Sequence, residues 1–216
     1  MVTVPVNTFA GGVDFKIFQN KYSRDIIGGG VMAYYDQAGD SKFGTTSGAF
    51  SLSYIKALNY YNNNFLSFGL LASYNERSLD YADLVFDNQF NGKNFDPALY
   101  NGETFLNKGF SYMDYAVGLH WYYKPNDDYT FNAGVSAWHL FTPGQSFWDN
   151  TDVKLDRKYT LYGNLDISMP NKRTLTPGLY FSRQGKYTEI IAGTYINFDD
   201  LKATSGFSVV KAGLFF

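Results

Sequence analysis

Few side chains in this sequence could act as nucleophiles, general bases or metal ligands. There is no Cys, and the two His residues, His120 and His139, have no second ligand at metal-site spacing. A catalytic Ser would need a His and an orienting carboxylate or amide within reach, and no nucleophile elbow marks one. The Gly28–Gly30 run lies inside a strand pattern and does not resemble a phosphate loop. We therefore predict no enzyme, no catalytic residue and no cofactor.

The two histidines are not expected to meet. If the segments 113–122 and 129–140 form a hairpin, His120 lies opposite a residue near 133. His139 is then about six residues further along the strand, or about 20 Å away. The sequence shows no favoured partner for either ring, so we predict structural or loop-packing roles.

One segment resembles the start of a calcium-binding loop. Residues 87–92 (Asp-Asn-Gln-Phe-Asn-Gly) place oxygen-bearing side chains at alternate positions and Gly at the sixth. The twelfth position is Ala98 instead of a bidentate Glu, and no helix pattern flanks the loop, so an EF-hand is rejected. Asp87, Asp96 and Glu103 could gather a loosely held cation, but a solvated external loop is the favoured alternative, and we predict no metal site.

The segments that position these residues alternate between apolar residues and small or polar residues with a period of two, as β-strands do. One face of the first segment reads Phe9, Gly11, Val13, Phe15, Ile17, and the other reads Thr8, Ala10, Gly12, Asp14, Lys16. Similar alternation recurs in about ten segments, each near the length of about 9–11 residues with which a tilted strand crosses a bilayer. They lie near 8–17, 25–36, 47–54, 66–75, 113–122, 129–140, 159–169, 174–183, 187–198 and 207–216. The predicted fold is all-β, an antiparallel transmembrane β-barrel of outer-membrane type.

The second face decides between a membrane barrel and the alternative, a soluble barrel. A small soluble barrel holds large apolar side chains inside and charge outside. Here the second face is dominated by Ser, Thr, Gly, Asn and Tyr, which suits a polar interior, and 19% of all residues are aromatic and gather toward strand ends. The mean hydropathy of −0.27 fits strands that show lipid only every second residue. A net charge of −2 indicates no nucleic-acid partner.

The connections indicate an orientation within a single barrel domain, 1–216. The two long ones, 78–110 and 141–157, fall on the same side, and short turns such as 20–24, 58–64, 125–128 and 170–173 lie opposite. Strand direction then places both chain ends on the long-loop side. The first residues also show no signal-peptide pattern. We therefore expect at least one strand to be missing at each end, leaving an open sheet with two unpaired edges.

Several of these segments resemble one known family. They are Asn7-Thr8-Phe9, the loop Phe86-Asp87-Asn88-Gln89-Phe90-Asn91-Gly92 with Phe95-Asp96-Pro97 and Gly102-Glu103, and His139 with Pro143 and Gln145-Ser146-Phe147. Together they are similar to the PorP/SprF family of type IX secretion system proteins in the bacterial outer membrane. The resemblance implies no catalysis. It implies a role in secreting or anchoring surface adhesins, with other type IX secretion components and outer-membrane lipid as partners.

The resemblance also suggests which loop residues matter. We expect the first long loop to be ordered by Asp87, Asn88, Gln89, Phe90, Gly92, Asp96, Pro97 and Glu103, and the second to be shaped by His139, Pro143 and Phe147. These residues either order the loops or contact cargo, and both alternatives stay open. The alternative function is an outer-membrane porin or hydrophobic-compound channel, which would need a continuous water path or a binding cavity, whereas the lumen of a docking barrel can be plugged.

Overall fold

The computed structural model describes residues 6–39, 42–81, 84, 86–102, 107–148, 150–198 and 210–216. Within these residues it contains ten strands and the short 3-10 helix η2 (Asp87–Gln89). The strands are β1 (Val6–Gln19), β2 (Ile26–Ala38), β3 (Phe43–Ala57), β4 (Asn64–Ser78), β5 (Gly109–Tyr123), β6 (Tyr129–Trp138), β7 (Lys158–Met169), β8 (Arg173–Gln184), β9 (Tyr187–Phe198) and β10 (Val210–Phe215). Each segment predicted from the period of two overlaps one of these strands, so the all-β prediction is confirmed.

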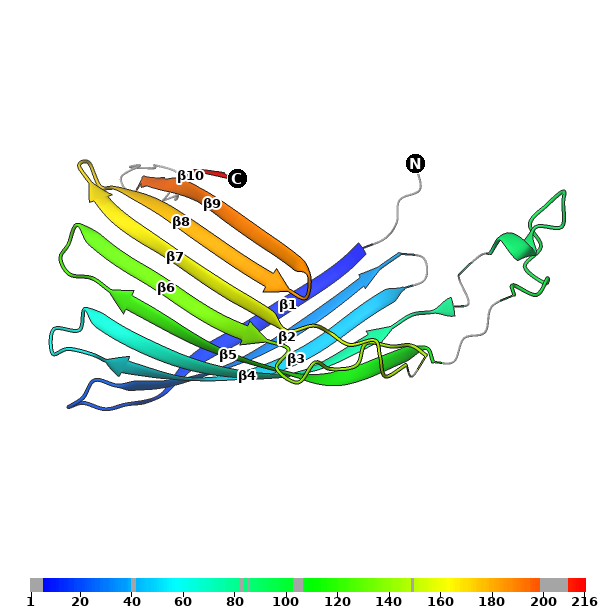
Figure 1. The fold of residues 1–216 in the computed structure, drawn as a ribbon, viewed down its shortest axis with the longest axis horizontal. Helices are drawn as coiled ribbons and strands as arrows, with labels where there is room; N and C mark the ends of the chain where they lie inside the picture. Colours follow the sequence, from blue (N-terminus) through cyan, green and yellow to red (C-terminus); the bar gives the residue numbers. More distant parts are fainter. Residues whose placement is uncertain are drawn as a thin grey trace.

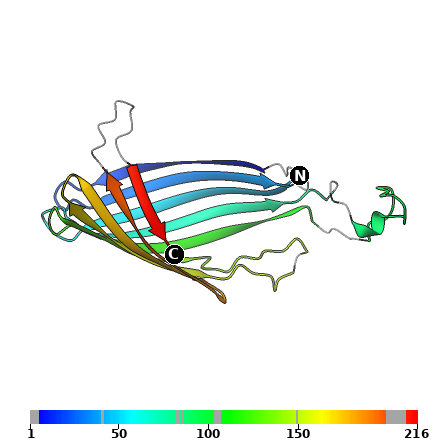
Figure 2. The same ribbon diagram turned by 90° about the horizontal axis from the view of Figure 1, so that it is seen from above.

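All ten strands form one antiparallel sheet in which each strand pairs with the next along the chain. The sheet twists and curls strongly, as Figures 1 and 2 show from two directions. It does not close into a barrel, because β1 and β10 are its two edges and do not pair with each other. The predicted open sheet is therefore observed, whereas a barrel is not. The predicted 198–206 connection falls mostly within 199–209, outside the described residues.

Pairing across the sheet places the small and polar residues on one face. Side chains of paired residues project from the same side of a sheet. Successive partners from β2 to β8 are Gly28, Ser53, Gly69, Gly118, Ser136, Thr160 and Ser182. A neighbouring row of partners, Leu52, Leu70, Val117, Ala137 and Tyr159, projects from the opposite face. We call the first the inner face and the second the outer face.

Burial is inverted relative to a water-soluble protein. Among the described residues, Ala116 is the one buried hydrophobic side chain, and the buried polar ones are Ser73, Gln89, Asp114, Thr176 and Ser182. Large apolar side chains of the outer face are about half exposed, with Leu70 at 44% and Leu161 at 47%. Thr176, only 1% exposed, donates its hydroxyl to Asp166 at 2.7 Å. Polar groups inside and apolar groups outside are typical of strands that face lipid.

Charge on the outer face is confined to the ends of the strands. In the described strands, four charged residues lie on this face, namely Lys56, Glu76, Arg173 and Arg183, each within two positions of a strand end. The uncharged stretch is limited at one end by Glu76, which pairs with Thr46 of β3, and at the other end by Lys56. From Thr46 to Lys56 it spans about 33 Å along the strand, or about 25 Å in depth at a tilt of about 40°. That depth matches the apolar band of a membrane barrel.

Aromatic side chains border this band on both sides. Tyr54, Trp121 and Tyr129 stand on the outer face near the short turns, and Tyr74 and Tyr159 stand near the long loops. Amphipathic rings prefer the boundary between hydrocarbon and headgroups. Tyr122, in contrast, points to the inner face, as its pairing with Phe65 and Asn132 shows. No helix in the described part of the chain is long and apolar enough to cross a membrane.

Candidate functional site

Both long connections leave the same edge of the sheet. Residues 79–108 join β4 to β5, and residues 139–157 join β6 to β7. Figure 1 shows the first loop reaching well beyond the ends of the strands and the second lying along the end of β5. The turns at the opposite edge that the structure describes are much shorter, namely residues 20–25, 58–63, 124–128 and 170–172. This arrangement agrees with the predicted orientation, and we call it the long-loop edge.

Gln89 organises the first loop. Its side chain is 8% exposed, and its Oε1 atom accepts a hydrogen bond from the Phe86 amide at 3.0 Å. Its Nε2 atom donates to the carbonyl oxygens of Pro97 at 3.5 Å and Leu99 at 3.4 Å. The Gln89 carbonyl accepts from the Asp96 amide at 2.8 Å. One buried amide therefore joins both halves of the loop, because it satisfies backbone groups that would otherwise lose their partners.

The other predicted residues of this loop surround Gln89. Phe90 bridges Phe95, and Gly92 adopts the left-handed conformation with φ of 92°. Asn88 donates to the Asn101 carbonyl at 3.4 Å, the Asp87 carbonyl accepts from the Phe90 amide, and the Asp96 carboxylate accepts from the Ala98 amide at 3.0 Å. Glu103 lies outside the described residues. No three metal-ligating side chains come together in the part of the chain that the structure describes.

The second loop doubles back on itself. Gly144 bridges Lys154, the Gln145 amide donates to the Val153 carbonyl at 2.8 Å, and the Leu155 amide donates to the Pro143 carbonyl at 2.9 Å. At its far end, the ring of Phe147 meets that of Phe110 edge-to-face at 4.8 Å between centroids. Pro143 and Phe147 thus lie at the base and the tip of one hairpin-like loop.

His139 ties this loop to the sheet. Its Nδ1 atom lies 2.7 Å from Oδ2 of Asp114 on the inner face of β5, and the two side chains are 18% and 9% exposed. The other carboxylate oxygen of Asp114 accepts from the Tyr115 amide at 2.9 Å. β5 pairs with β6 only from Val117 onward, so the loop lies beside the part of β5 that β6 leaves uncovered. There the Leu140 amide donates to the Tyr115 carbonyl at 3.2 Å.

Sequence reasoning missed Asp114 as the partner of His139, although a signal was present. His120 is paired with Gly134, one residue from the predicted position, and His139 lies five residues further on, about 17 Å along the strand. The two histidines are apart, as predicted. The same predicted hairpin register also sets Asp114 opposite residue 139, which would have identified the pair.

The Asp114–His139 pair lacks the other parts of a hydrolytic site. Among the described residues no hydroxyl group bonds to the ring of His139. The hydroxyl group of Ser73, the cross-strand partner of Asp114, accepts instead from the side-chain amide of Asn75. The Oδ1 atom of Asn75 in turn accepts from the Ser47 hydroxyl at 2.7 Å. The Asp114–His139 contact therefore joins the second loop to the inner face of β5.

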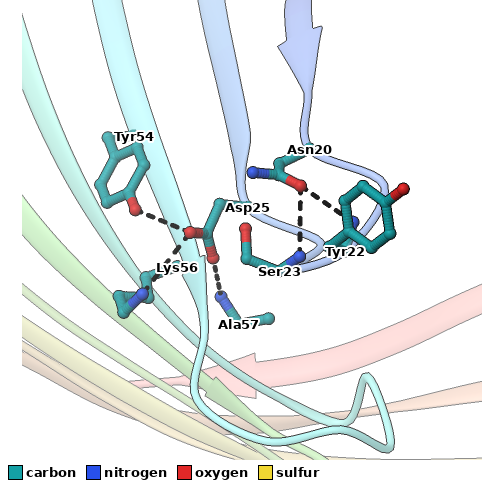
Figure 3. Close-up of polar contacts among 7 residues, drawn as sticks. All are labelled: Asn20, Tyr22, Ser23, Asp25, Tyr54, Lys56 and Ala57. Carbon is teal, nitrogen blue, oxygen red and sulfur yellow. Dashed lines mark hydrogen bonds and ion pairs between the residues drawn. The ribbon is translucent and has the colours of Figure 1, made fainter.

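The opposite edge, which we call the short-turn edge, carries a second polar cluster (Figure 3). Asp25 accepts hydrogen bonds from the Tyr54 hydroxyl at 2.9 Å and the Ala57 amide at 3.1 Å, and pairs with Lys56 at 3.5 Å. The hydrogen bond from Tyr54, followed by smaller contributions from Ser23, Ala57 and Lys56, holds the pKa of Asp25 below its usual value despite partial desolvation. The carboxylate therefore joins the first turn to the end of β3.

A comparison with protein families identifies the chain's relatives. The model described as "Type IX secretion system membrane protein PorP/SprF" matches residues 2–213. The chain belongs to the PorP/SprF family. The resemblance inferred from the loop residues is thereby confirmed. Searches of curated proteins and of solved structures found no match.

Membership makes this PorP/SprF chain a membrane component of the type IX secretion system, whose other components are its implied partners. The family is one of secretion-system membrane proteins and not a known enzyme family. Both long loops of the PorP/SprF chain expose apolar side chains, notably Tyr100 at 74%, Phe141 at 73% and Trp148 at 56%. Chemically, such an edge can bind another protein.

Proposed function

We propose that the protein is a non-enzymatic outer-membrane component of the type IX secretion system that docks secreted surface proteins, such as adhesins, on its long-loop edge. The single observation that carries the proposal is the exposure of aromatic side chains on two internally ordered loops at that edge. Tyr and Trp are enriched where proteins bind one another, because they bury much apolar area at small conformational cost.

The internal order of the loops supports docking over simple coverage of the sheet. Gln89 and the Asp114–His139 pair hold the two loops in fixed shapes, while Tyr100 and Trp148 remain exposed. A surface that is ordered before binding loses less conformational entropy when a partner arrives. The residues predicted to order the loops would thus support cargo contact indirectly.

The proposed location is the outer membrane, and the proposed complete fold is a β-barrel. The apolar outer face, the band of about 25 Å and its aromatic borders support both proposals. In such barrels the long loops face the exterior, which would place the docking edge at the cell surface. Exported proteins would then meet the loops as they emerge.

Site-specific photocrosslinking in cells that carry a working type IX system tests this function. A photoreactive residue at Tyr100 or Trp148 is expected to capture a secreted surface protein. The matched control is Tyr60 at the short-turn edge, 78% exposed, which is expected to capture none. Substituting Tyr100→Ser together with Trp148→Ser should reduce surface display of the captured protein while the variant still inserts in the membrane.

The alternative function as a channel predicts different results for crosslinking and for conductance. Reconstitution in a planar bilayer would then show clear conductance, and the crosslinking positions would capture no secreted protein. That pair of results would refute the docking proposal. Unchanged surface display in the double variant, despite normal membrane insertion of the protein, would refute the role assigned to the two aromatic side chains.

A further inference from the structure

We propose that the short-turn edge holds the phosphate of an anionic phospholipid, bound by Lys21, Arg24 and Lys56 beside Tyr54 and Tyr60. The site lies where the turn between β1 and β2 meets the turn between β3 and β4. It is distinct from the long-loop edge, and its occupant is the surrounding membrane.

The two turns are fixed together before any lipid binds. Asp25 joins the first turn to β3 through Tyr54, Lys56 and the Ala57 amide (Figure 3). Arg24, in the left-handed conformation with φ of 60°, donates from Nη1 to the Tyr60 carbonyl at 2.5 Å. Its guanidinium group also lies 4.7 Å from the centre of the Tyr60 ring. The guanidinium position is therefore set by two contacts to the neighbouring turn.

Most of the positive charge in this cluster is left without a counter-ion. Lys21 and Arg24 belong to the first turn and Lys56 to the end of β3. The one carboxylate described beside them, Asp25, pairs with Lys56 at the long distance of 3.5 Å. Among the described residues, neither Lys21 nor Arg24 forms an ion pair with a carboxylate. A guanidinium group has five N–H donors, and Arg24 directs one of them to Tyr60. The remaining donors suit the oxygens of a phosphate group.

The cluster lies at the depth where phospholipid headgroups are found. Tyr54 and Lys56 belong to the outer face and continue the row that contains the exposed side chains of Phe50 and Leu52. Ile17 and Phe18, at the end of β1, are 52% and 56% exposed. Tyr60 and Tyr61 extend beyond them at 78% and 82%. A basic cluster directly outside an apolar band, with tyrosines around it, meets the phosphates of the lipids that cover the band.

The test uses the full chain, purified in detergent and exchanged into nanodiscs that contain equal amounts of phosphatidylglycerol and phosphatidylcholine. Native mass spectrometry then measures which lipid the released protein retains. We expect the protein to retain phosphatidylglycerol preferentially. Each basic residue near a membrane surface contributes about a fivefold preference, so Lys21→Gln with Arg24→Gln should reduce the preference by about 25-fold. Lys93→Gln with Lys154→Gln, an equal charge change on the long loops, should leave it unchanged.

A single-residue variant and a competition with inorganic phosphate test the lipid site further. Lys21→Gln alone removes an exposed side chain without other contacts in the described structure, so it should preserve folding and reduce the preference by about fivefold. Inorganic phosphate at millimolar concentration should not displace the retained phosphatidylglycerol. The proposal is overturned if the wild type shows no preference, if the turn and loop variants reduce it equally, or if free phosphate abolishes it. Failure here would leave the docking of secreted proteins untouched, because crosslinking from Tyr100 or Trp148 tests that separately.

Discussion

The apolar outer face predicts a depth-dependent cost for a buried charge. Leu70 pairs with Leu52 and Val117 near the middle of the band, whereas Leu66 pairs with Lys56 and Trp121 at its border. The two positions are four residues apart, about 13 Å along the strand and about 10 Å in depth. Leu70→Arg should therefore destabilise the folded protein in a bilayer by about 2–4 kcal/mol, and Leu66→Arg by about 0–1 kcal/mol.

Urea unfolding of the protein in lipid vesicles, followed by tryptophan fluorescence, measures both free energies. Leu71→Arg controls for the face of the sheet, because Leu71 projects inward between Ser51 and Ala116, which are both small. We expect this variant to cost less than Leu70→Arg even though the two positions are adjacent. Equal costs at Leu66 and Leu70, or a greater cost at Leu71, would refute the assignment of the outer face to lipid.

Three other predictions concern the polar contacts. Asp114→Asn should raise the fraction of molecules in which loop 139–157 is detached from the sheet by about tenfold. The change removes the carboxylate from its hydrogen bond with His139, which is worth about 1–3 kcal/mol. The rate of trypsin cleavage in the loop measures this fraction. Gln89→Ala should accelerate hydrogen exchange in the first loop without changing global unfolding, because its contacts are local. The hydrogen bond from Tyr54 lowers the pKa of Asp25 in the folded protein. The Asp25 carboxylate therefore stabilises the fold at neutral pH, and this stabilisation is lost as the pH falls below 3.8.

Each of these predictions has its own control. A His139→Asn change should open the same loop as Asp114→Asn, and the double variant should add little, because the two share one contact. Additive effects would contradict the pairing. Gln89→Glu keeps the acceptor for the Phe86 amide but loses the donor, so intermediate exchange is expected, and wild-type exchange would rule out the role of the donor. For Asp25→Asn, the difference in urea midpoint from the wild type should shrink in acid, and a constant difference would exclude the linkage.

The sequence predicted the strands well because alternation is a local property. In β5, Met113, Val117 and Leu119 face outward in the structure as the period of two indicated. Strand ends were placed less well: β3 and β4 each extend several residues beyond the predicted 47–54 and 66–75. Thr, Asn and Glu continue these strands past the apolar stretch, where hydropathy no longer alternates but backbone pairing still satisfies the amides and carbonyls.

The contacts of the loops were harder to predict because they join distant positions. Gln89 was chosen from the resemblance, but its bonds to the carbonyls of Pro97 and Leu99 depend on the path of the chain, which composition does not encode. Asp114 is different, because the hairpin register already placed it opposite residue 139.

The two edges of the sheet therefore differ in their polar contacts. At the long-loop edge, hydrogen bonds of Gln89 and Asp114 satisfy the loops internally and leave aromatic side chains exposed. At the short-turn edge, Arg24 is fixed but without a carboxylate among the described residues, beside tyrosines that border the apolar band. Because the edges are separated by the band of about 25 Å, substitutions at one should leave the other's binding intact. Coupled effects would instead require that the curled sheet transmit strain between its ends.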